Sequence, residues 1–313
     1  MCATCGCGDD GGVRVIDLRP GADIAPHAHP HPADHTHPHP ADHTHPHPAH
    51  AHPLGDESAE RNGTGTETLT LQARVLAKND GLAGENRGWL RARGLVAVNL
   101  MSSPGSGKTS LLERTVRAVV SSNSPNSSVC VVEGDQETTF DAERILAAGA
   151  PVLQVNTGSG CHLDAAMLRT ALQTLDPTEG LVLIENVGNL VCPALFDLGE
   201  DARVVIMSVT EGADKPLKYP QIFAAATAVV LNKIDLLPYV DFDVARFERD
   251  VRLVNPRAVI LHVSATRGDG LPAWFDWLSN AAATCSASSY IASCPESTAG
   301  ETPTPTEQIL PPQ

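Results

Sequence analysis

An eight-residue stretch of mostly small residues, Ser102-Ser103-Pro104-Gly105-Ser106-Gly107-Lys108-Thr109, constrains the fold of this chain more than any other feature. An apolar run, 96–100, comes before it, and a helix-length segment, 109–120, continues from it. Small residues let the backbone curl so that its N–H groups and the N-terminus of the following helix can face phosphate oxygens. The order of strand, loop and helix therefore predicts a phosphate-binding loop in an α/β domain.

The residue types in this loop each have a chemical use. Lys108 can reach the terminal phosphates of a nucleotide, and the hydroxyl group of Thr109 can ligate magnesium. Ser102 departs from the general pattern, in which a glycine opens the loop. A Gly/Ser turn with a surface lysine is the alternative. The predicted nucleotide-binding residues of this segment are Gly105, Ser106, Gly107, Lys108, Thr109 and Ser110.

Short apolar runs recur along the chain, and helix-length segments separate most of them. Continuous apolar strands separated by helices indicate a mostly parallel sheet flanked by helices, which together with the phosphate loop is the P-loop NTPase class of α/β fold. A helical pattern also covers 68–91, with Gly81 and Gly84 as candidate breaks. The predicted strands are 96–100, 129–132, 152–155, 181–184, 203–209, 228–231 and 259–263. The predicted helices of the α/β part are 109–120, 163–175, 242–254 and 271–282.

Apolar residues make up 42% of the 313 residues, which is enough for a sizeable core, and they concentrate in the middle of the chain. Both ends are instead rich in Pro, Ser, Thr, Gly or His. We therefore expect one nucleotide-binding domain at 67–283, a disordered metal-binding arm at 1–66 and a disordered tail at 284–313.

The charge balance excludes two classes of partner. A net charge of -15 argues against binding to nucleic acid and to anionic membrane surfaces, because both need clustered Lys and Arg. The sequence has no run of about 18 apolar residues, and its amino terminus lacks a basic segment followed by an apolar one. We expect a cytoplasmic protein, in which the eight cysteines stay reduced and are available for metal binding.

A second motif, Asn232-Lys233-Ile234-Asp235, follows another apolar strand. The Asp235 carboxylate can accept hydrogen bonds from N1–H and the exocyclic amine of guanine, whereas adenine offers no such donor pair on that edge. Asn232 can brace the loop, and the stem of Lys233 can lie along the base. Behind a phosphate loop, this motif predicts that the nucleotide is GTP. Ser264-Ala265-Thr266 resembles the backbone contact that GTPases make to the guanine carbonyl, with an ordinary strand-to-helix turn as the alternative.

Acidic residues that end two predicted strands are candidates for catalysis. Glu185 can hold magnesium directly or through water, and the N–H group of Gly188 can sense the third phosphate. Asp135, in the segment 133–138, is expected to bind magnesium or to position the attacking water, with a plain acidic loop as the alternative. The predicted catalytic residues are Lys108, Asp135 and Glu185, and the predicted magnesium ligands are Thr109, Asp135 and Glu185.

Three cysteines, Cys2, Cys5 and Cys7, lie beside the terminal amine. Three thiolates and an amine form a soft, four-ligand site that suits zinc, and a small chelate that includes an amine also suits square-planar nickel. A Cys-x-x-Cys redox motif is the alternative, but no strand precedes it and no amphipathic helix follows it.

The segment from His27 to His52 carries eleven of the thirteen histidines and includes two consecutive copies of the octapeptide His-Pro-Ala-Asp-His-Thr-His-Pro. Many imidazoles on an extended chain suit weak, multiple binding of nickel, copper or zinc. A solubilising linker is the alternative. The predicted weak nickel-storage residues are His27, His29, His31, His35, His37, His39, His43, His45, His47, His50 and His52.

A third candidate metal site lies inside the folded domain, at Cys161, His162 and Cys192. Two sulfurs and one nitrogen leave a coordination position open, which suits a nickel or zinc ion that must be handed on. Because Cys192 lies only four residues beyond Gly188, nucleotide state and metal affinity are expected to be coupled. Buried structural cysteines beside an unrelated histidine are the alternative.

Several of these motifs together resemble the HypB family of nickel-inserting GTPases that act in hydrogenase maturation. The resemblance covers about 75–278 and reaches the amino terminus through Met1-Cys2-Ala3-Thr4-Cys5-Gly6-Cys7. Ser102 matches the family's own loop. The segments that carry the resemblance within the domain are Val75-Leu76-Ala77-Lys78-Asn79-Asp80, Asn99 to Thr109, Gly160-Cys161-His162-Leu163-Asp164, Glu185 to Pro193 and Asp214-Lys215-Pro216-Leu217-Lys218-Tyr219-Pro220.

The resemblance implies a GTPase that forms a homodimer with nucleotide, with Cys161, His162 and Cys192 at the dimer interface. It also implies that nickel passes to a scaffold protein and then to the large-subunit precursor of a nickel-iron hydrogenase. GTP, Mg²⁺, Ni²⁺ and Zn²⁺ are the expected ligands. Two alternatives remain, a nickel storage protein and a related chaperone GTPase for urease or a cobalamin enzyme.

Overall fold

The computed structural model describes residues 14–18, 61–122, 128–135, 139–158 and 160–291. Eight strands of this part form one sheet in the order β1-β4-β3-β5-β2-β6-β7-β8. Every neighbouring pair from β4 to β8 in this order is parallel, and β1 pairs antiparallel with β4 at the edge. The strands are β1 (Arg14–Asp17), β2 (Leu95–Ser102), β3 (Val129–Asp135), β4 (Val152–Asn156), β5 (Gly180–Glu185), β6 (Ala202–Ser208), β7 (Ala228–Asn232) and β8 (Val259–His262).

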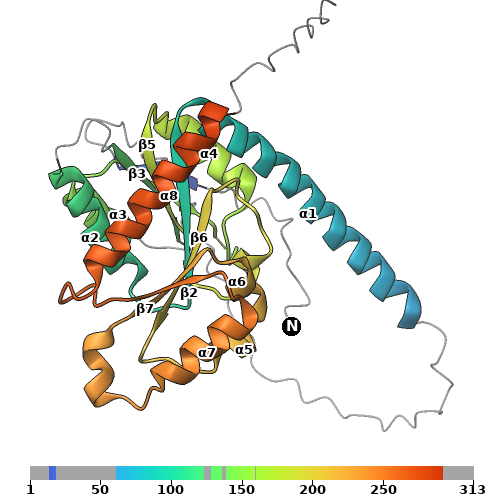
Figure 1. Cartoon of the computed structure of the whole chain (residues 1–313). Helices are drawn as coiled ribbons and strands as arrows, with labels where there is room; N and C mark the ends of the chain where they lie inside the picture. The colour runs from blue at the N-terminus through green and yellow to red at the C-terminus, as the bar shows by residue number, and fades with distance from the viewer. Residues whose placement is uncertain (1–13, 19–60, 123–127, 136–138, 159, 292–313) are drawn as a thin grey trace, which may run out of the picture.

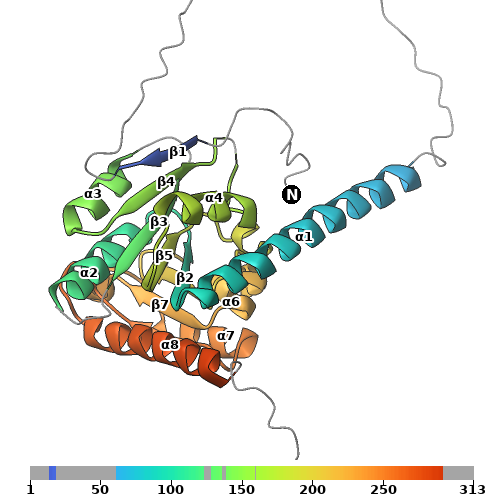
Figure 2. The same cartoon turned by 90° about the horizontal axis from the view of Figure 1, so that it is seen from above.

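Helices cover both faces of the sheet (Figures 1 and 2). The α-helices are α1 (Arg61–Ala92), α2 (Lys108–Ser121), α3 (Phe140–Ala148), α4 (Ala165–Leu175), α5 (Lys215–Lys218), α6 (Pro220–Ala225), α7 (Val244–Val254) and α8 (Leu271–Ile291). Two short 3-10 helices, η1 (Cys192–Ala194) and η2 (Ile234–Tyr239), follow β5 and β7. The prediction of a mostly parallel sheet flanked by helices is confirmed.

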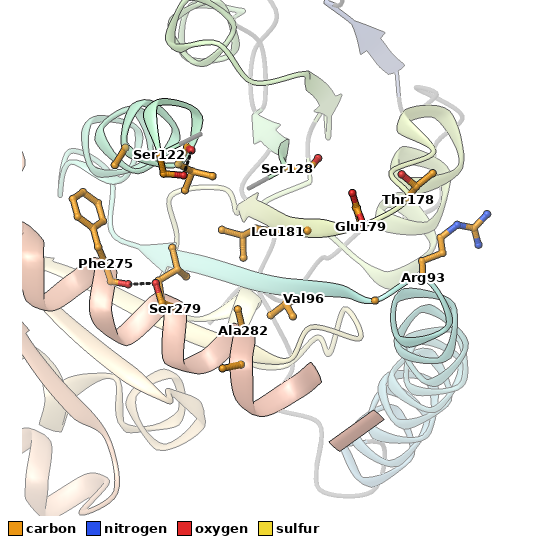
Figure 3. Close-up of a pocket in the computed structure, with 16 residues that line it drawn as sticks. Arg93, Val96, Ser122, Ser128, Thr178, Glu179, Leu181, Phe275, Ser279 and Ala282 are labelled. Atoms are coloured by element: carbon orange, nitrogen blue, oxygen red, sulfur yellow. Dashed lines mark hydrogen bonds between the residues drawn. The ribbon is translucent and has the colours of Figure 1, made fainter. Parts of the chain in front are cut away.

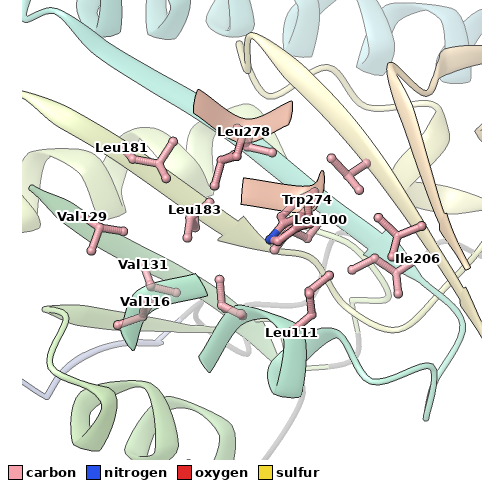
Figure 4. Close-up of a cluster of buried hydrophobic side chains, with 14 of the residues drawn as sticks. Leu100, Leu111, Val116, Val129, Val131, Leu181, Leu183, Ile206, Trp274 and Leu278 are labelled. Atoms are coloured by element: carbon pink, nitrogen blue, oxygen red, sulfur yellow. The ribbon is translucent and has the colours of Figure 1, made fainter. Parts of the chain in front are cut away.

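The core forms two layers because strand side chains alternate between the faces of the sheet. On one face, apolar residues of α2, α3 and α8 pack on β2, β3 and β5, and Trp274 of α8 donates a 2.8 Å hydrogen bond to Thr115 of α2 (Figure 4). On the other face, α1 and α4 pack on β3, β4 and β5, while α6 and α7 pack on β6 and β7. Every central strand is therefore covered by helices on both faces, as its continuous apolar sequence predicts.

All seven predicted strands are present, and the structure corrects three other expectations. The α1 helix runs unbroken through Gly81 and Gly84, because one face of it packs on the core at Ala83 and Leu90, which are fully buried. It also begins at Arg61, within the segment assigned to the arm. Strand β1 lies within that arm segment as well, and α8 continues to Ile291, into the segment assigned to the tail.

No helix in the described part of the chain combines the length and the apolar character that a membrane span requires.

Candidate functional site

The phosphate loop joins β2 to α2 and opens onto a cavity of about 540 Å³ at the carboxyl ends of the strands. Gly105 and Gly107 have φ values of 74° and 95°, which residues with a side chain rarely adopt, so these two positions require glycine. The cavity is lined by Pro104, Gly105, Ser106, Gly107, Lys108, Thr109, Ser110, Glu133, Gly134, Asp135, Asp141, Arg144, Glu185, Asn186, Val187, Gly188 and Lys233. Most of the predicted phosphate and magnesium residues therefore lie together around one space.

Two side chains of the loop are already held in place. The Lys108 ammonium donates a 3.0 Å hydrogen bond to the Ser102 hydroxyl, so the unusual first residue of the loop fixes the lysine. The Thr109 hydroxyl donates to Glu185 Oε1 at 2.8 Å. Burial raises the pKa of Glu185, and the charge of Lys108 and the Thr109 hydrogen bond oppose that increase. Two of the predicted magnesium ligands, Thr109 and Glu185, are thus hydrogen-bonded to each other beside Lys108.

Acidic side chains crowd the wall opposite the loop. Asp135 ends β3 and lines the cavity, as predicted, and so does Glu133 two residues earlier, which sequence reasoning passed over. Glu133 is 2% exposed, and burial together with the charges of Glu185, Asp135 and Asp141 raises its pKa to about 9. The alternating sequence Glu133-Gly134-Asp135 was the available signal, because it places both acids on one face of the strand.

The segment after β5 lies directly against the phosphate loop. A Cβ atom added at Gly188 would lie 3.2 Å from three atoms of Pro104, so the chain approaches the loop as closely as a glycine allows. Such proximity is what a residue that senses the third phosphate needs.

The guanine motif is tied to the same loop. Asn232 is buried at the end of β7, donates to the Ser106 carbonyl at 2.9 Å and accepts from the Ala265 N–H at 3.1 Å. Lys233, in the left-handed conformation with φ of 61°, donates to the Gly105 carbonyl at 2.7 Å. One asparagine therefore joins the phosphate loop to the predicted guanine contact, although these segments are far apart in the sequence.

The other two guanine-motif positions lie beside this junction. Asp235 is half-buried in the first turn of η2. Ser264 is fully buried, and its hydroxyl group accepts from the Arg267 N–H at 3.0 Å, so its side chain stabilises its own turn. Ala265 lines a neighbouring cavity of about 390 Å³ with Ser110. Because the Ala265 N–H group is bonded to Asn232, it must exchange that partner to bind a guanine carbonyl.

The inner metal-site residues come together from two loops. The ligand atoms of Cys161, His162 and Cys192 all lie within 4.8 Å of one another, and Cys161 Sγ is 3.7 Å from His162 Nδ1. His162 stacks on Phe196 with ring centroids 3.9 Å apart. Desolvation lowers the pKa of His162, and the charge of Asp164 opposes that effect only in part. A neutral imidazole and two half-buried thiols form a soft set that suits nickel or zinc.

Two asparagines connect this cluster to the segment that contacts the phosphate loop. Asn186, which follows Glu185, is buried and accepts from the Leu163 N–H at 3.1 Å. Asn189 donates to the Cys161 carbonyl at 3.4 Å. The chain that carries two metal ligands is therefore hydrogen-bonded to residues on both sides of Gly188.

A larger cavity, of about 770 Å³, lies at the opposite end of the sheet (Figure 3). Side chains of α2, α8 and the amino-terminal ends of β2 and β5 line it, and Phe275 and Ser279 project toward it from α8. Ligands of open α/β sheets bind outside the carboxyl ends of the strands, so the smaller cavity at the phosphate loop is the candidate site.

Comparison with known proteins identifies the family. The family model described as the nucleotide-binding domain of CobW, HypB and UreG matches residues 96–262. The hydrogenase maturation factor HypB of Escherichia coli K12 is 44% identical over 289 residues, which cover 89% of this chain and 98% of that protein. The chain belongs to the HypB family of hydrogenase maturation factors.

Two solved HypB structures share the fold. The protein from Archaeoglobus fulgidus is 42% identical, with a TM-score of 0.61 over 66% of this chain and 99% of its own. The protein from Helicobacter pylori, solved in complex with nickel, is 37% identical, with a TM-score of 0.62 over 66% of this chain and 96% of its own. The phosphate loop, the acidic wall and the cysteine–histidine cluster lie within the nucleotide-binding domain that defines this family.

The remaining predicted ligands of the HypB arm are not part of the described structure. Cys2, Cys5 and Cys7 lie outside the described residues, as do the eleven histidines from His27 to His52. Their assignment stays a prediction from the sequence.

Proposed function

We propose that this HypB-family chain hydrolyses GTP with magnesium and uses the nucleotide to control a nickel ion at Cys161, His162 and Cys192. The phosphate end of the site supports the first half. Lys108 would neutralise the terminal phosphates, and Thr109 and Asp135, with Glu185, would hold the magnesium ion, which supplies charge neutralisation when bound. The donor set fits a hard divalent cation, because it consists of oxygen atoms that converge on one cavity.

The observation that carries the proposal is the hydrogen-bonded connection between the two sites. Asn186 and Asn189 flank Gly188 and bind the backbone on either side of His162. If Gly188 moves when the third phosphate leaves, these two bonds move the Cys161-His162 segment relative to Cys192. Nickel is the cargo in this scheme, and its affinity differs between the two nucleotide states.

Metal titration of the purified chain in each nucleotide state tests this proposal. Nickel affinity of the inner site should differ between the complex with GDP and the complex with a non-hydrolysable GTP analogue. Equal affinities would refute the coupling. Because the arm also offers ligands, the titration is repeated on a chain in which serine replaces Cys2, Cys5 and Cys7 and residues 27–52 are deleted, which keeps β1 and its pairing with β4.

Substitution of one ligand tests the site itself. Cys161→Ala should weaken nickel binding to the folded domain while it leaves GTP affinity nearly intact. Cys130→Ala is the matched control, because Cys130 is buried in β3 outside the cluster. Unchanged nickel affinity in Cys161→Ala would overturn the assignment.

Nickel would pass from this site to a scaffold protein and to the large-subunit precursor of a nickel-iron hydrogenase, with the chain acting in the cytoplasm as a homodimer.

Storage of nickel by the arm, His27 to His52, is the second candidate role. Deletion of the arm should impair hydrogenase activity mainly when nickel is scarce, whereas a defect in nickel-replete medium favours storage as the main function. Urease or cobalamin-enzyme maturation is the third candidate, and loss of urease activity but not of hydrogenase activity in a knockout strain would favour it.

A further inference from the structure

Two buried carboxyl groups stand side by side at the phosphate end of the sheet. Glu133 of β3 and Glu185 of β5 are direct partners in the register of two parallel strands. Residues in register on adjacent parallel strands point to the same face of the sheet. Here that face carries α2 and the phosphate loop, because Val131 and Leu183, two residues earlier, pack with α2. Both carboxyl groups therefore point toward the nucleotide side.

Each of these carboxyl groups has one oxygen without a hydrogen-bond partner among the described residues. Glu133 is 2% exposed and Glu185 is 3% exposed, and in both the Oε2 atom lacks a partner. The hydroxyl oxygen of Ser106, in the loop itself, is also buried and unpartnered. A buried oxygen without a partner is destabilising, so three of them around one cavity indicate that a ligand supplies the missing donors.

The charges of the site define that ligand. Four acidic residues and three basic ones line the cavity that the polyphosphate of a nucleotide must also enter, and Arg144 pairs with Asp141 at 3.3 Å. The acids are Glu133, Asp135, Asp141 and Glu185, and the bases are Lys108, Arg144 and Lys233. Oxygen-rich sites that must hold phosphates are neutralised by magnesium, which usually keeps several of its waters. Coordinated waters are strong hydrogen-bond donors and match unpartnered carboxylate oxygens.

We propose that Glu133 is a further positioning residue of the hydrolytic site, which accepts hydrogen bonds from the waters of the magnesium ion and holds that ion jointly with Glu185. This role rests on the proposed GTP hydrolysis and extends it to a residue outside the phosphate loop, the guanine motif and the predicted magnesium ligands. Glu133 would act through the ion's water shell, whereas Thr109 and Asp135 would bind the ion itself.

The local sequence holds Glu133 in a fixed position. Gly134, the next residue, faces the opposite side of the sheet, and a Cβ atom there would lie 2.7 Å from Leu163 Cγ. Strand β3 is therefore clamped between Leu163 on one face and α2 on the other. A carboxyl group on so constrained a strand binds the ion with little further loss of backbone entropy.

Binding of magnesium by the GDP complex tests the proposal without any turnover. In Glu133→Gln, which keeps the shape and removes the charge, magnesium affinity measured by calorimetric titration should fall about 10- to 100-fold, the range for loss of an outer-shell partner. GDP affinity in EDTA should be unchanged, because the proposed role of Glu133 requires the magnesium ion. Glu143→Gln is the control, since Glu143 is an exposed acid on α3.

Thermal unfolding of the free protein separates this role from a structural one. Glu133→Gln should melt at about the same temperature, because it keeps the shape of the side chain and Oε2 of Glu133 has no hydrogen-bond partner to lose among the described residues. Wild-type magnesium affinity in a folded Glu133→Gln protein would overturn the proposal, even if the wild type hydrolyses GTP normally. If Glu133→Gln fails to fold, Glu133→Asp replaces it, and a shortened carboxylate that binds magnesium as tightly as wild type would also overturn the proposal. Absence of GTP turnover in wild type with intact magnesium binding would instead refute the proposed hydrolysis.

Discussion

The contact between Gly134 and Leu163 can be measured by a double-mutant cycle. A Cβ atom at Gly134 would lie 2.7 Å from Leu163 Cγ and 2.9 Å from each Cδ, all closer than normal contact. The backbone of Gly134 needs no left-handed φ, so Gly134→Ala adds no backbone strain and its cost in the folded state comes from this contact. Overpacking of a core costs about 1–3 kcal/mol, of which the lower chain entropy of alanine offsets about 0.5–1 kcal/mol.

Substitution of Leu163, the other residue of this contact, leaves empty space in the core instead of crowding it. Leu163 is fully buried, so Leu163→Ala should lower the free energy of unfolding by about 2–5 kcal/mol through lost burial and a cavity. In the double variant, the methyl group at Gly134 enters the space that the leucine leaves. The double variant should therefore be less destabilised than the sum of the two single variants, by about 1–2 kcal/mol.

Urea unfolding of the four proteins, followed by circular dichroism, gives the interaction energy. Gly88→Ala is the control for the general effect of alanine, because Gly88 is exposed within α1 and nothing lies within 4 Å of its added Cβ. That control should gain about 0.5–1 kcal/mol. Additive costs within about 0.5 kcal/mol would refute the packing argument, and with it the clamp on β3.

Two further predictions concern single substitutions that remove hydrogen bonds seen in the structure. Asn232→Ala should weaken binding of both GTP and GDP in calorimetry, and cost about 1–3 kcal/mol in urea unfolding, because it leaves the Ser106 carbonyl and the Ala265 N–H without their buried partner. Asp197→Asn should cost about 1 kcal/mol at pH 7, where Arg87 donates to both carboxylate oxygens. Desolvation raises the pKa of Asp197, but the hydrogen bond and charge of Arg87 contribute to a net decrease. The stabilisation that ionised Asp197 contributes is therefore present above the unfolded pKa and is lost as pH falls through the folded pKa. Urea unfolding of wild type and Asp197→Asn at pH 7 and at about pH 2 should show that the difference between them disappears in acid.

Most of the fold was predictable because its strands are buried on both faces. A central strand such as β5 has a continuous apolar sequence, and the turn or loop after it is polar, so the run and its end are both visible. The edge strand β1 has only four residues, three of them half-buried, and it depends on its antiparallel pairing with β4. Such a strand has no sequence pattern of its own and escapes prediction.

Helix α1 shows a case in which local helix propensity predicted a break that the fold does not have. Gly81 and Gly84 lower helix propensity by about 1 kcal/mol each, which made a break reasonable. Tertiary contacts outweigh that cost, since Asn86 donates to the Ala165 and Leu198 carbonyls and Arg87 binds Asp197. These partners lie about 80 to 110 residues away, so no local pattern could indicate them.

The candidate site was predictable where a motif is contiguous and not where distant segments meet. The phosphate loop and the cysteine–histidine pair are contiguous, and their residues come together as expected. The bond from Asn232 to the loop was expected only as a general brace, and the role of Asn186 was not expected, because hydrogen-bond partners across a sheet depend on strand order. Glu133 was missed because, as the first residue of the predicted acidic loop, it carries no local sign that the sheet register places it beside Glu185.

The two faces of β3 explain why one short segment can serve both sites. Side chains alternate along a strand, so Glu133 and Asp135 point toward the phosphate loop while Gly134 points away. Leu163 fills the space at Gly134 and directly follows His162, a candidate nickel ligand. Because β3 is held between Leu163 and α2, a small shift of the acids on binding of the magnesium nucleotide would be transmitted to Leu163 and so to the metal-binding segment. This contact reaches His162 independently of the Asn189 bond, so nucleotide control of nickel should weaken but persist in Asn189→Ala.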